Sequence, residues 1–339
     1  MDPRTIRYGA DNIARRFLAV APNERVALLS WKADDLRSVV ADAIAGAGGE
    51  PVLVELNDLA GASQARATTA LVSRFAGCTA SVLLAEHGIP PALSMATLDA
   101  VQRTRARHLH VTRVDARLFG QSYRADPDLI ARINERVVSA LEGARAIEVR
   151  SASGTELTVR LDARYPLIAS DGRPQPGRPD NLPSGTVRFH PASVDGVLVA
   201  DRGAIGAVRP DPALVRRYPL SFHFAQGRVE RVECESSELL DAVEEYRSRD
   251  ENAMRVGLVA VPTNYVVRSE TGIEVQDALL PGVNVILGYS NAEATNAPFK
   301  CPVQLRLFGR RQDVVAGGVT LVDGGRLTDG LVGEIDPFR

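Results

Sequence analysis

The first part of the chain alternates short apolar runs with longer segments in which apolar residues recur every three or four positions. The apolar runs, which have the length of buried strands, lie at 25–30, 51–56, 80–84 and 107–111. The segments with helical spacing lie at 5–20, 36–44, 63–76, 94–104 and 127–141. Asp34 or Asp35 is expected to cap the second helix. Strands that alternate with helices predict a doubly wound, mainly parallel sheet.

After residue 142 the period changes to two, which is typical of strands. Residues 147–150 and 157–161 alternate apolar with polar side chains and flank a short turn, so they predict a hairpin. The remaining predicted elements are strands at 187–200, 220–224 and 228–232, a helix at 236–249 and a hairpin at 319–327. Residues 171–183 hold four prolines and two glycines and are expected to form a surface loop.

These patterns predict an α/β protein with two domains. Residues 1–142 form a doubly wound domain with a mainly parallel sheet, and residues 143–339 form a β-rich α+β domain that carries the proline-rich loop. A chain of 339 residues is long enough for two cores, because single cores stop growing near roughly 250–300 residues. With 45% hydrophobic and 24% charged residues the composition is that of an ordinary globular protein.

Charge and cysteine content exclude several classes of function. The net charge of −2 gives no electrostatic case for binding nucleic acid or an anionic membrane. The three cysteines are far apart and show no C-x-x-C spacing, which argues against a structural zinc site and a disulfide framework. No apolar signal region and no long apolar run is present, so we expect a cytoplasmic protein that does not span a membrane.

Five motifs occur in an order that resembles one known family. They are the hairpin 147–161, the turn Asn181-Leu182-Pro183-Ser184-Gly185, the pair Thr263-Asn264, the segment 277–288 and the hairpin around Asp323-Gly324-Gly325. This order resembles the aminopeptidase T type of metallopeptidase, a family that also includes ring-cleaving dihydroxypyridine dioxygenases. The resemblance extends over nearly the whole chain. It implies an N-terminal α/β domain and a C-terminal domain whose cleft binds two metal ions in the peptidases.

Residues that cannot bind a metal ion in the expected way occupy the positions where the resemblance places metal ligands. The family pattern expects a glutamate at Thr186, a glutamate at about Leu258, a histidine at Asn284 and a His-x-Asp strand near 301–305. Only Asp277 keeps a carboxylate near a further ligand position, and no histidine follows His223. Zinc, cobalt and manganese sites need at least three imidazole, carboxylate or thiolate groups. We therefore expect no metal, no cofactor and no catalytic residues of the family type.

The sequence thus suggests a degenerate relative that keeps the cleft and uses it to hold a peptide. Aromatic and amide side chains can bury the apolar side chains of a peptide and bind its backbone. The candidate cleft residues are Thr186, His190, Asn264, Tyr265, Asn284, Tyr289, Asn291 and Phe299. The resemblance extends to peptide-binding partners in pathways for ribosomally made, modified peptides, the crocagin type in particular. It implies a precursor peptide as ligand, tailoring enzymes as partners and a homodimer.

Two other hypotheses remain open. The first is an enzyme with relocated ligands, a metal-dependent aminopeptidase or other hydrolase or a non-haem iron oxygenase, in which His190 or His223 would act with Glu233 or Glu235. His108 and His110 alternate on a predicted strand and could begin a metal site, although two histidines at the end of a strand are more often structural. The second hypothesis is a purely structural subunit.

Overall fold

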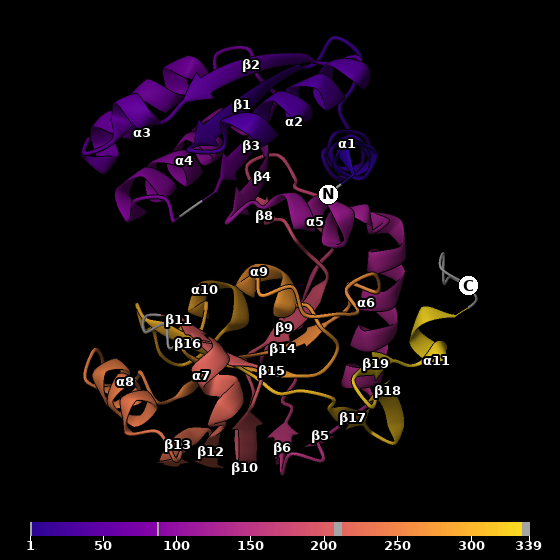
Figure 1. Ribbon diagram of the computed structural model, residues 1–339, viewed down its shortest axis with the longest axis vertical. Coiled ribbons are helices and arrows are strands. Elements are labelled where there is room, and N and C mark those ends of the chain that lie inside the picture. The colour runs from indigo at the N-terminus through magenta and orange to yellow at the C-terminus, as the bar shows by residue number, and fades with distance from the viewer. Residues whose placement is uncertain (1, 87, 207–211, 334–339) are drawn as a thin grey trace. The chain divides into compact units, whose positions relative to one another are not determined.

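The computed structural model describes residues 2–86, 88–206 and 212–333, which form two compact units (Figure 1). The first unit consists of Met1–Leu129 with Ser170–Ser184, and the second of Ile130–Ala169 with Gly185–Arg339. This division differs from the expected boundary at residue 142. The segment 170–184 joins the first unit because it contributes a strand to that unit's sheet, and most of α6 (Pro127–Glu142) belongs to the second unit.

The first unit is built on a parallel sheet, as the apolar runs predict. Its strand order is β2-β1-β3-β4-β8, and every pair is parallel. The strands are β1 (Arg25–Trp31), β2 (Glu50–Glu55), β3 (Ala80–Ala85), β4 (Arg107–Thr112) and β8 (Asp180–Asn181). The last of these lies in the proline-rich segment. The expectation that 171–183 is entirely loop is therefore wrong at this point, because Asn181 pairs with His110 and Leu182 is buried.

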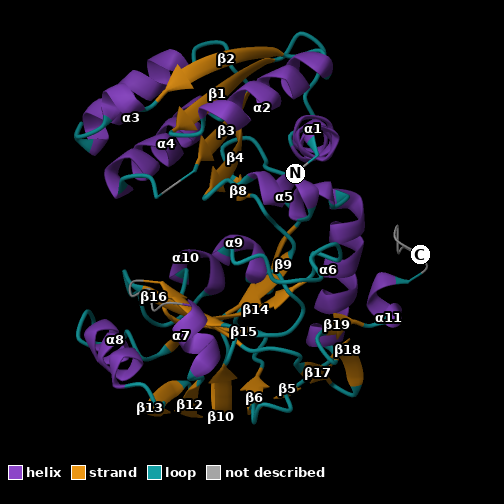
Figure 2. Ribbon diagram, viewed as in Figure 1, coloured by secondary structure: helices purple, strands orange, loops and turns teal. Residues whose placement is uncertain are grey.

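Helices cover the sheet of the first unit (Figure 2). They are α1 (Pro3–Asn12), α2 (Asp34–Gly46), α3 (Gln64–Arg74), α4 (Pro91–Thr104) and α5 (Ala116–Gly120). Apolar residues of α3 and α4 form one core cluster with Leu29 and Leu83 of the sheet. A π-helical turn at Ile13–Phe17 extends α1. Neither Asp34 nor Asp35 caps α2, because the cap position is Ala33 and both carboxylates lie in the first turn, where they still favour the positive end of the helix dipole.

The second unit contains two antiparallel sheets. The larger sheet has the order β13-β12-β10-β6-β5-β17-β18-β19, and the smaller has the order β11-β16-β15-β14-β9-β7. Strands of the larger sheet are β5 (Ala146–Arg150), β6 (Glu156–Arg160), β10 (Ser193–Ala200), β12 (Leu220–Ala225), β13 (Arg228–Glu233), β17 (Asp313–Ala316), β18 (Val319–Asp323) and β19 (Arg326–Leu327). Strands of the smaller sheet are β7 (Ile168–Ser170), β9 (Thr186–Phe189), β11 (Gly203–Gly206), β14 (Val256–Pro262), β15 (Asn284–Gly288) and β16 (Gln304–Phe308). Both predicted hairpins are confirmed.

Short helices complete the second unit. They are α7 (Pro212–Arg217), α8 (Ser237–Arg247), α9 (Glu274–Asp277), α10 (Ala292–Thr295) and α11 (Asp329–Val332). Ser236 caps α8 by accepting a hydrogen bond from the Leu239 amide. Among the described residues, no helix has both the length and the apolar character needed to cross a membrane.

One face of the smaller sheet consists of buried apolar side chains. Every second residue of its central strands is at most 2% exposed, and these residues are Val187, Phe189, Val259, Val261, Val285, Leu287, Leu305 and Leu307. Because successive side chains point to opposite faces of a strand, the residues between them must point the other way. The second face is therefore fixed by the burial of the first.

A glycine at the start of β9 allows two segments of the second unit to approach each other. Gly185 has a φ of +110°, and a Cβ at this position would lie 2.8 Å from the Asn264 amide nitrogen. The Gly185 carbonyl accepts a hydrogen bond of 2.8 Å from the Thr263 amide. This contact fixes the place at which β9 begins, and with it the position of Thr186.

We expect Gly185→Ala to lower the free energy of unfolding by about 1–3 kcal/mol, because the methyl group meets backbone atoms and the φ angle is unfavourable for alanine. Gly318→Ala is the matched control, since Gly318 has a φ of +86° but no atom within 4 Å of its added Cβ. Denaturant unfolding of both variants measures the difference. Equal losses in the two variants would show that the close approach to Asn264 is unimportant.

Candidate functional site

Strand pairing places several polar side chains on the second face of the smaller sheet. Ala260 pairs with both Arg188 and Asn284, and residues directly opposite in a sheet point to the same side. Ile286 pairs with Leu258 and Arg306, and it lies two residues after Asn284. We call this side of strands β9, β14, β15 and β16 the β9–β16 face. Its polar members are Thr186, Arg188, Asn284, Gln304 and Arg306.

Two arginines give the β9–β16 face an uncompensated positive charge. Burial, with a smaller contribution from the positive charge of Arg188, lowers the pKa of Arg306 to about 10. Among the described residues neither arginine forms an ion pair, and Arg188 Nε is buried with no hydrogen-bond partner. Most buried donors in proteins are paired. Two guanidinium groups of this kind on one face are suited to an anion.

An apolar cluster lies between the two arginines. Leu258, Ala260 and Ile286 form a separate small cluster of buried residues and are each at most 4% exposed. Asn284 is 3% exposed, and its Nδ2 donates a hydrogen bond of 2.7 Å to the Ala278 carbonyl. The face therefore combines two cations with buried apolar residues and one oriented amide.

The expected site residue His190 lies in an aromatic group rather than on open surface. Its Nδ1 lies 2.8 Å from the carbonyl oxygen of Gly257, the extra residue of a bulge in β14, so Nδ1 carries the proton. The imidazole makes edge contacts with the rings of Tyr165 and Phe299, at centroid distances of 4.6 and 5.8 Å. Arg255 stacks on Phe299 with its guanidinium carbon 4.1 Å from the ring centroid. Burial lowers the pKa of His190, so this histidine is a neutral, structurally bound side chain.

The other expected residues lie in two cavities and at one buried position. Tyr289 and Asn291 line a cavity of about 390 Å³ together with Lys300 and Cys301, and the Tyr289 side chain is 43% exposed. Tyr265 lines a second cavity of about 290 Å³ with Val267 and Pro281. Asn264 is buried against Gly185.

The structure thus brings only some of the expected site residues together. Thr186 and Asn284 share the β9–β16 face, and His190 and Phe299 share the aromatic group. The sequence reasoning missed Arg188 and Arg306. A signal for them was present. Each is a charged residue at a polar position of an alternating strand, one or two residues from a position where the resemblance places a metal ligand.

The comparisons with known proteins agree with this architecture. Residues 16–256 match the family model for NicX, described as 2,5-dihydroxypyridine 5,6-dioxygenase. The chain belongs to the NicX family. The match to the NicX model includes Thr186 and Arg188 but ends before β15 and β16, which carry Asn284 and Arg306.

Two solved structures share the fold of this NicX-family chain. The 2,5-dihydroxypyridine dioxygenase from Pseudomonas putida KT2440 superposes with a TM-score of 0.64 at 17% identity, covering 95% of this chain and 96% of the other. Wild-type AmpT from Thermus thermophilus gives a TM-score of 0.65 at 17% identity, covering 96% and 99%. The fold is therefore aminopeptidase T-like, as the order of motifs predicts. The comparison with curated protein sequences gave no match.

The donor groups on the β9–β16 face do not fit the metal ions that the resemblance implies. Thr186, Leu258 and Asn284 supply a hydroxyl, a hydrocarbon and an amide, none of which is an imidazole or carboxylate ligand. Arg188 and Arg306 would repel a divalent cation. The carboxylate of Asp277 accepts hydrogen bonds of 2.8 to 2.9 Å from Thr271 and Gly272, so it serves the local loop.

The relocated ligands that the sequence left open are not assembled either. His223 Nε2 and Glu233 Oε2 lie 2.9 Å apart on neighbouring strands β12 and β13, but His190 is bound in the aromatic group. Within residues 2–86, 88–206 and 212–333, no three histidine, cysteine, aspartate or glutamate side chains converge in a way that could hold a metal ion.

His108 and His110 do lie on the same side of β4, in the first unit. His108 Nδ1 is 2.8 Å from Ser81 Oγ, and His108 Nε2 is 3.3 Å from His110 Nδ1. Burial lowers the pKa of His108 well below its ordinary value, with a small contribution from His110, and burial lowers the pKa of His110 to about 4. Both histidines are neutral structural groups at physiological pH.

These lowered pKa values predict acid sensitivity. The unfolded chain protonates these histidines near pH 6.5, whereas the folded chain protonates His110 only near pH 4. The folded protein therefore keeps its full stability above about pH 6.5 and loses stability as the pH falls towards 4. Over this pH range the free energy of unfolding of the wild type should fall. We expect the fall to be about 2–3 kcal/mol smaller in His110→Gln. Urea unfolding at several pH values measures this. The same pH dependence in both proteins would contradict burial of a neutral His110.

Proposed function

We propose that this chain is a non-catalytic peptide-binding protein built on the aminopeptidase T-like scaffold. The observation that carries the proposal is the composition of the β9–β16 face. Where the resemblance places metal ligands, this face has Thr186, Leu258 and Asn284, flanked by the cations Arg188 and Arg306. A face of this composition favours holding an anionic ligand over activating water at a metal ion.

The chemistry of the face specifies the kind of peptide. A guanidinium group binds a carboxylate through two parallel hydrogen bonds, so Arg188 and Arg306 suit an acidic side chain or the C-terminal carboxylate of a peptide. The apolar cluster of Leu258, Ala260 and Ile286 lies between them and, although each of its residues is at most 4% exposed, gives this part of the face an apolar character. A peptide with a carboxylate next to an apolar residue would satisfy both.

A flexible peptide would be held by these few anchors. An unstructured precursor loses conformational entropy when it is ordered, so its affinity depends on well-buried contacts more than on total area. We propose that the protein holds a ribosomally made precursor peptide while partner enzymes modify it, in the biosynthesis of a natural product. The working state in this proposal is a cytoplasmic homodimer.

A second candidate function is favoured by one specific observation, the match of residues 16–256 to a dioxygenase family model. In this alternative the protein is a metal-dependent dioxygenase or hydrolase whose ligands have moved. His223 and Glu233, 2.9 Å apart, are a pair from which such a site could start. Glu233 also forms an ion pair with Arg231, whose Nη1 lies 3.2 Å from Glu233 Oε1. This contact favours a surface ion-pair network instead.

The peptide proposal predicts that binding depends on Arg306. We expect affinity selection from a random heptapeptide library to enrich peptides with a carboxylate next to an apolar residue. Arg306→Gln and Arg188→Gln should each weaken the selected peptides about 10- to 100-fold, because each removes a charge-assisted hydrogen bond. Isothermal titration calorimetry with free and amidated versions of each peptide measures the effect and identifies the carboxylate.

Arg231→Gln is the matched control, because Arg231 is a 63% exposed arginine on β13. Its affinity should equal that of the wild type. A selection that enriches no peptide, or peptides that bind Arg306→Gln as tightly as the wild type, would overturn the proposal.

A further inference from the structure

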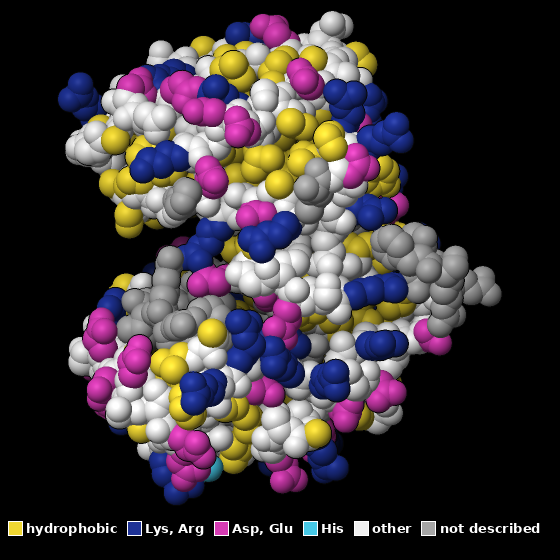
Figure 3. Space-filling model, in the orientation of Figure 1, with side chains coloured by type: hydrophobic (Ala, Val, Ile, Leu, Met, Phe, Trp, Pro, Cys, Tyr) yellow, Lys and Arg dark blue, Asp and Glu magenta, His cyan; other side chains and the backbone are white. Residues whose placement is uncertain are grey.

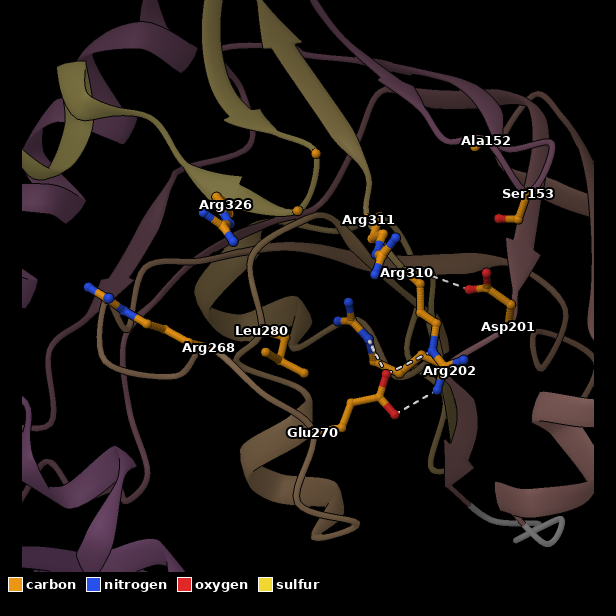
Figure 4. A pocket seen from close by; sticks show the side chains of 12 residues that line it. Ala152, Ser153, Asp201, Arg202, Arg268, Glu270, Leu280, Arg310, Arg311 and Arg326 are labelled. Carbon is orange, nitrogen blue, oxygen red and sulfur yellow. Dashed lines mark hydrogen bonds and ion pairs between the residues drawn. The ribbon is translucent and has the colours of Figure 1, made fainter.

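A second cationic site lies at the end of the smaller sheet, in a cavity of about 580 Å³ within the second unit (Figure 4). Loops bring its arginines together from distant parts of the sequence. Arg202 precedes β11, Arg310 and Arg311 connect β16 to β17, and Arg326 begins β19. We call this cavity the arginine pocket. Figure 3 shows several Lys and Arg side chains close together on the second unit.

The lining of the arginine pocket has an excess of positive charge. It contains five arginines, the four named above and Arg268, but only two carboxylates, Asp201 and Glu270. The remaining lining is small, polar or aliphatic and includes no aromatic ring. The pocket therefore suits the charged group of a ligand and offers no platform for stacking a base or ring.

Both carboxylates are already engaged. Glu270 accepts two hydrogen bonds of 2.7 Å from Arg310 and lies 3.9 Å from Arg202 Nε and 3.7 Å from Arg216. Asp201 accepts a hydrogen bond of 2.7 Å from the Arg310 amide. Burial alone would raise the pKa of Glu270, but its hydrogen bonds and ion pair with Arg310, helped by Arg202 and Arg216, hold that pKa below its ordinary value. Within the described residues, Arg311 and Arg326 have no carboxylate partner.

The buried side chain of Arg202 is a second, independent observation that points to a ligand. Its side chain is only 8% exposed, and its Nε has no hydrogen-bond partner among the described residues, because the 3.9 Å to Glu270 is too long for a hydrogen bond. Buried donors without partners are rare in folded proteins. A ligand oxygen in the pocket would satisfy this donor.

A glycine turn holds the backbone that carries the two exposed arginines, Arg311 and Arg326. The Gly325 amide donates a hydrogen bond of 2.9 Å to the Gln312 carbonyl, and the Gly324 amide donates one of 2.6 Å to Asp313 Oδ1. A Cβ on Gly325 would lie 2.9 Å from Arg311 Cα, so only glycine allows this approach. The turn between β18 and β19 thus fixes the backbone just before Arg326 against the backbone of Arg311.

We propose that the arginine pocket binds the diphosphate group of a small molecule. Five guanidinium groups offer more donors than one carboxylate can accept, whereas the oxygens of a diphosphate can pair with several arginines at once. Arg311 and Arg326, which have no carboxylate partner among the described residues, and the unpartnered Nε of Arg202 remain to bind such oxygens. This inference does not depend on the proposed peptide, because the pocket and the β9–β16 face use different residues.

Isothermal titration calorimetry of the full chain with inorganic pyrophosphate and with ADP tests the proposal. We expect binding that weakens as the salt concentration rises, because the contacts are ionic. Arg311→Gln and Arg326→Gln, both at exposed positions, should each weaken binding about 10-fold or more. Tighter binding of ADP would identify a diphosphate ester as the ligand, and tighter binding of pyrophosphate would identify the free anion, and both results support the site.

Arg202→Met is a more severe variant because Arg202 is buried, so its folding is checked first by thermal unfolding. The exposed Arg231→Gln variant is the matched control and should bind as the wild type does. The proposal is overturned if neither pyrophosphate nor ADP binds. It is also overturned if Arg311→Gln and Arg326→Gln bind as tightly as Arg231→Gln, since the affinity would then come from general surface charge.

Discussion

The alternation of buried and outward residues in the smaller sheet is the constraint on which the candidate site depends. Burial of Val187, Val259, Val285 and Leu307 in the core leaves no freedom for the residues between them. A shift of one strand by one residue would move its two core side chains, such as Val187 and Phe189 of β9, to the opposite face, at about 1.5–3 kcal/mol for each large side chain that loses its burial. The core of the second unit therefore fixes the β9–β16 face with Arg188 and Arg306.

This dependence explains how a scaffold can keep its fold while its chemistry changes. The chain belongs to the NicX family and shares its fold with a dioxygenase and with AmpT at only 17% identity. The core side of each strand is apolar, whereas the opposite side combines the buried apolar residues Leu258 and Ile286 with polar side chains such as Arg188. Thr186, Leu258 and Asn284 stand on that side where the resemblance places metal ligands. In the proposed function, Arg188 and Arg306 beside them favour an anion over a cation.

The sequence predicted the elements of this fold well and the site only in part. Periodicity located β1 to β4, α2 to α4 and both hairpins, because each depends on local burial on one face. It did not predict β8 or the assignment of 170–184 to the first unit, because the pairing of Asn181 with His110 is a long-range contact. Thr186 and Asn284 were identified through motifs. The sequence does not reveal the arginine pocket, because Arg202, Arg311 and Arg326 come from separate segments that only the folded chain brings together.

We propose that the β9–β16 face of the smaller sheet has exchanged metal binding for anion binding. Metal content is the most direct test. Protein purified without chelator would be analysed by mass spectrometry, then analysed again after incubation with zinc, cobalt, manganese and iron(II) and desalting. The donor groups of Thr186, Leu258 and Asn284 predict far less than one ion per chain under every condition. Retention of about one ion per chain after desalting would contradict the account and favour the dioxygenase or hydrolase alternative.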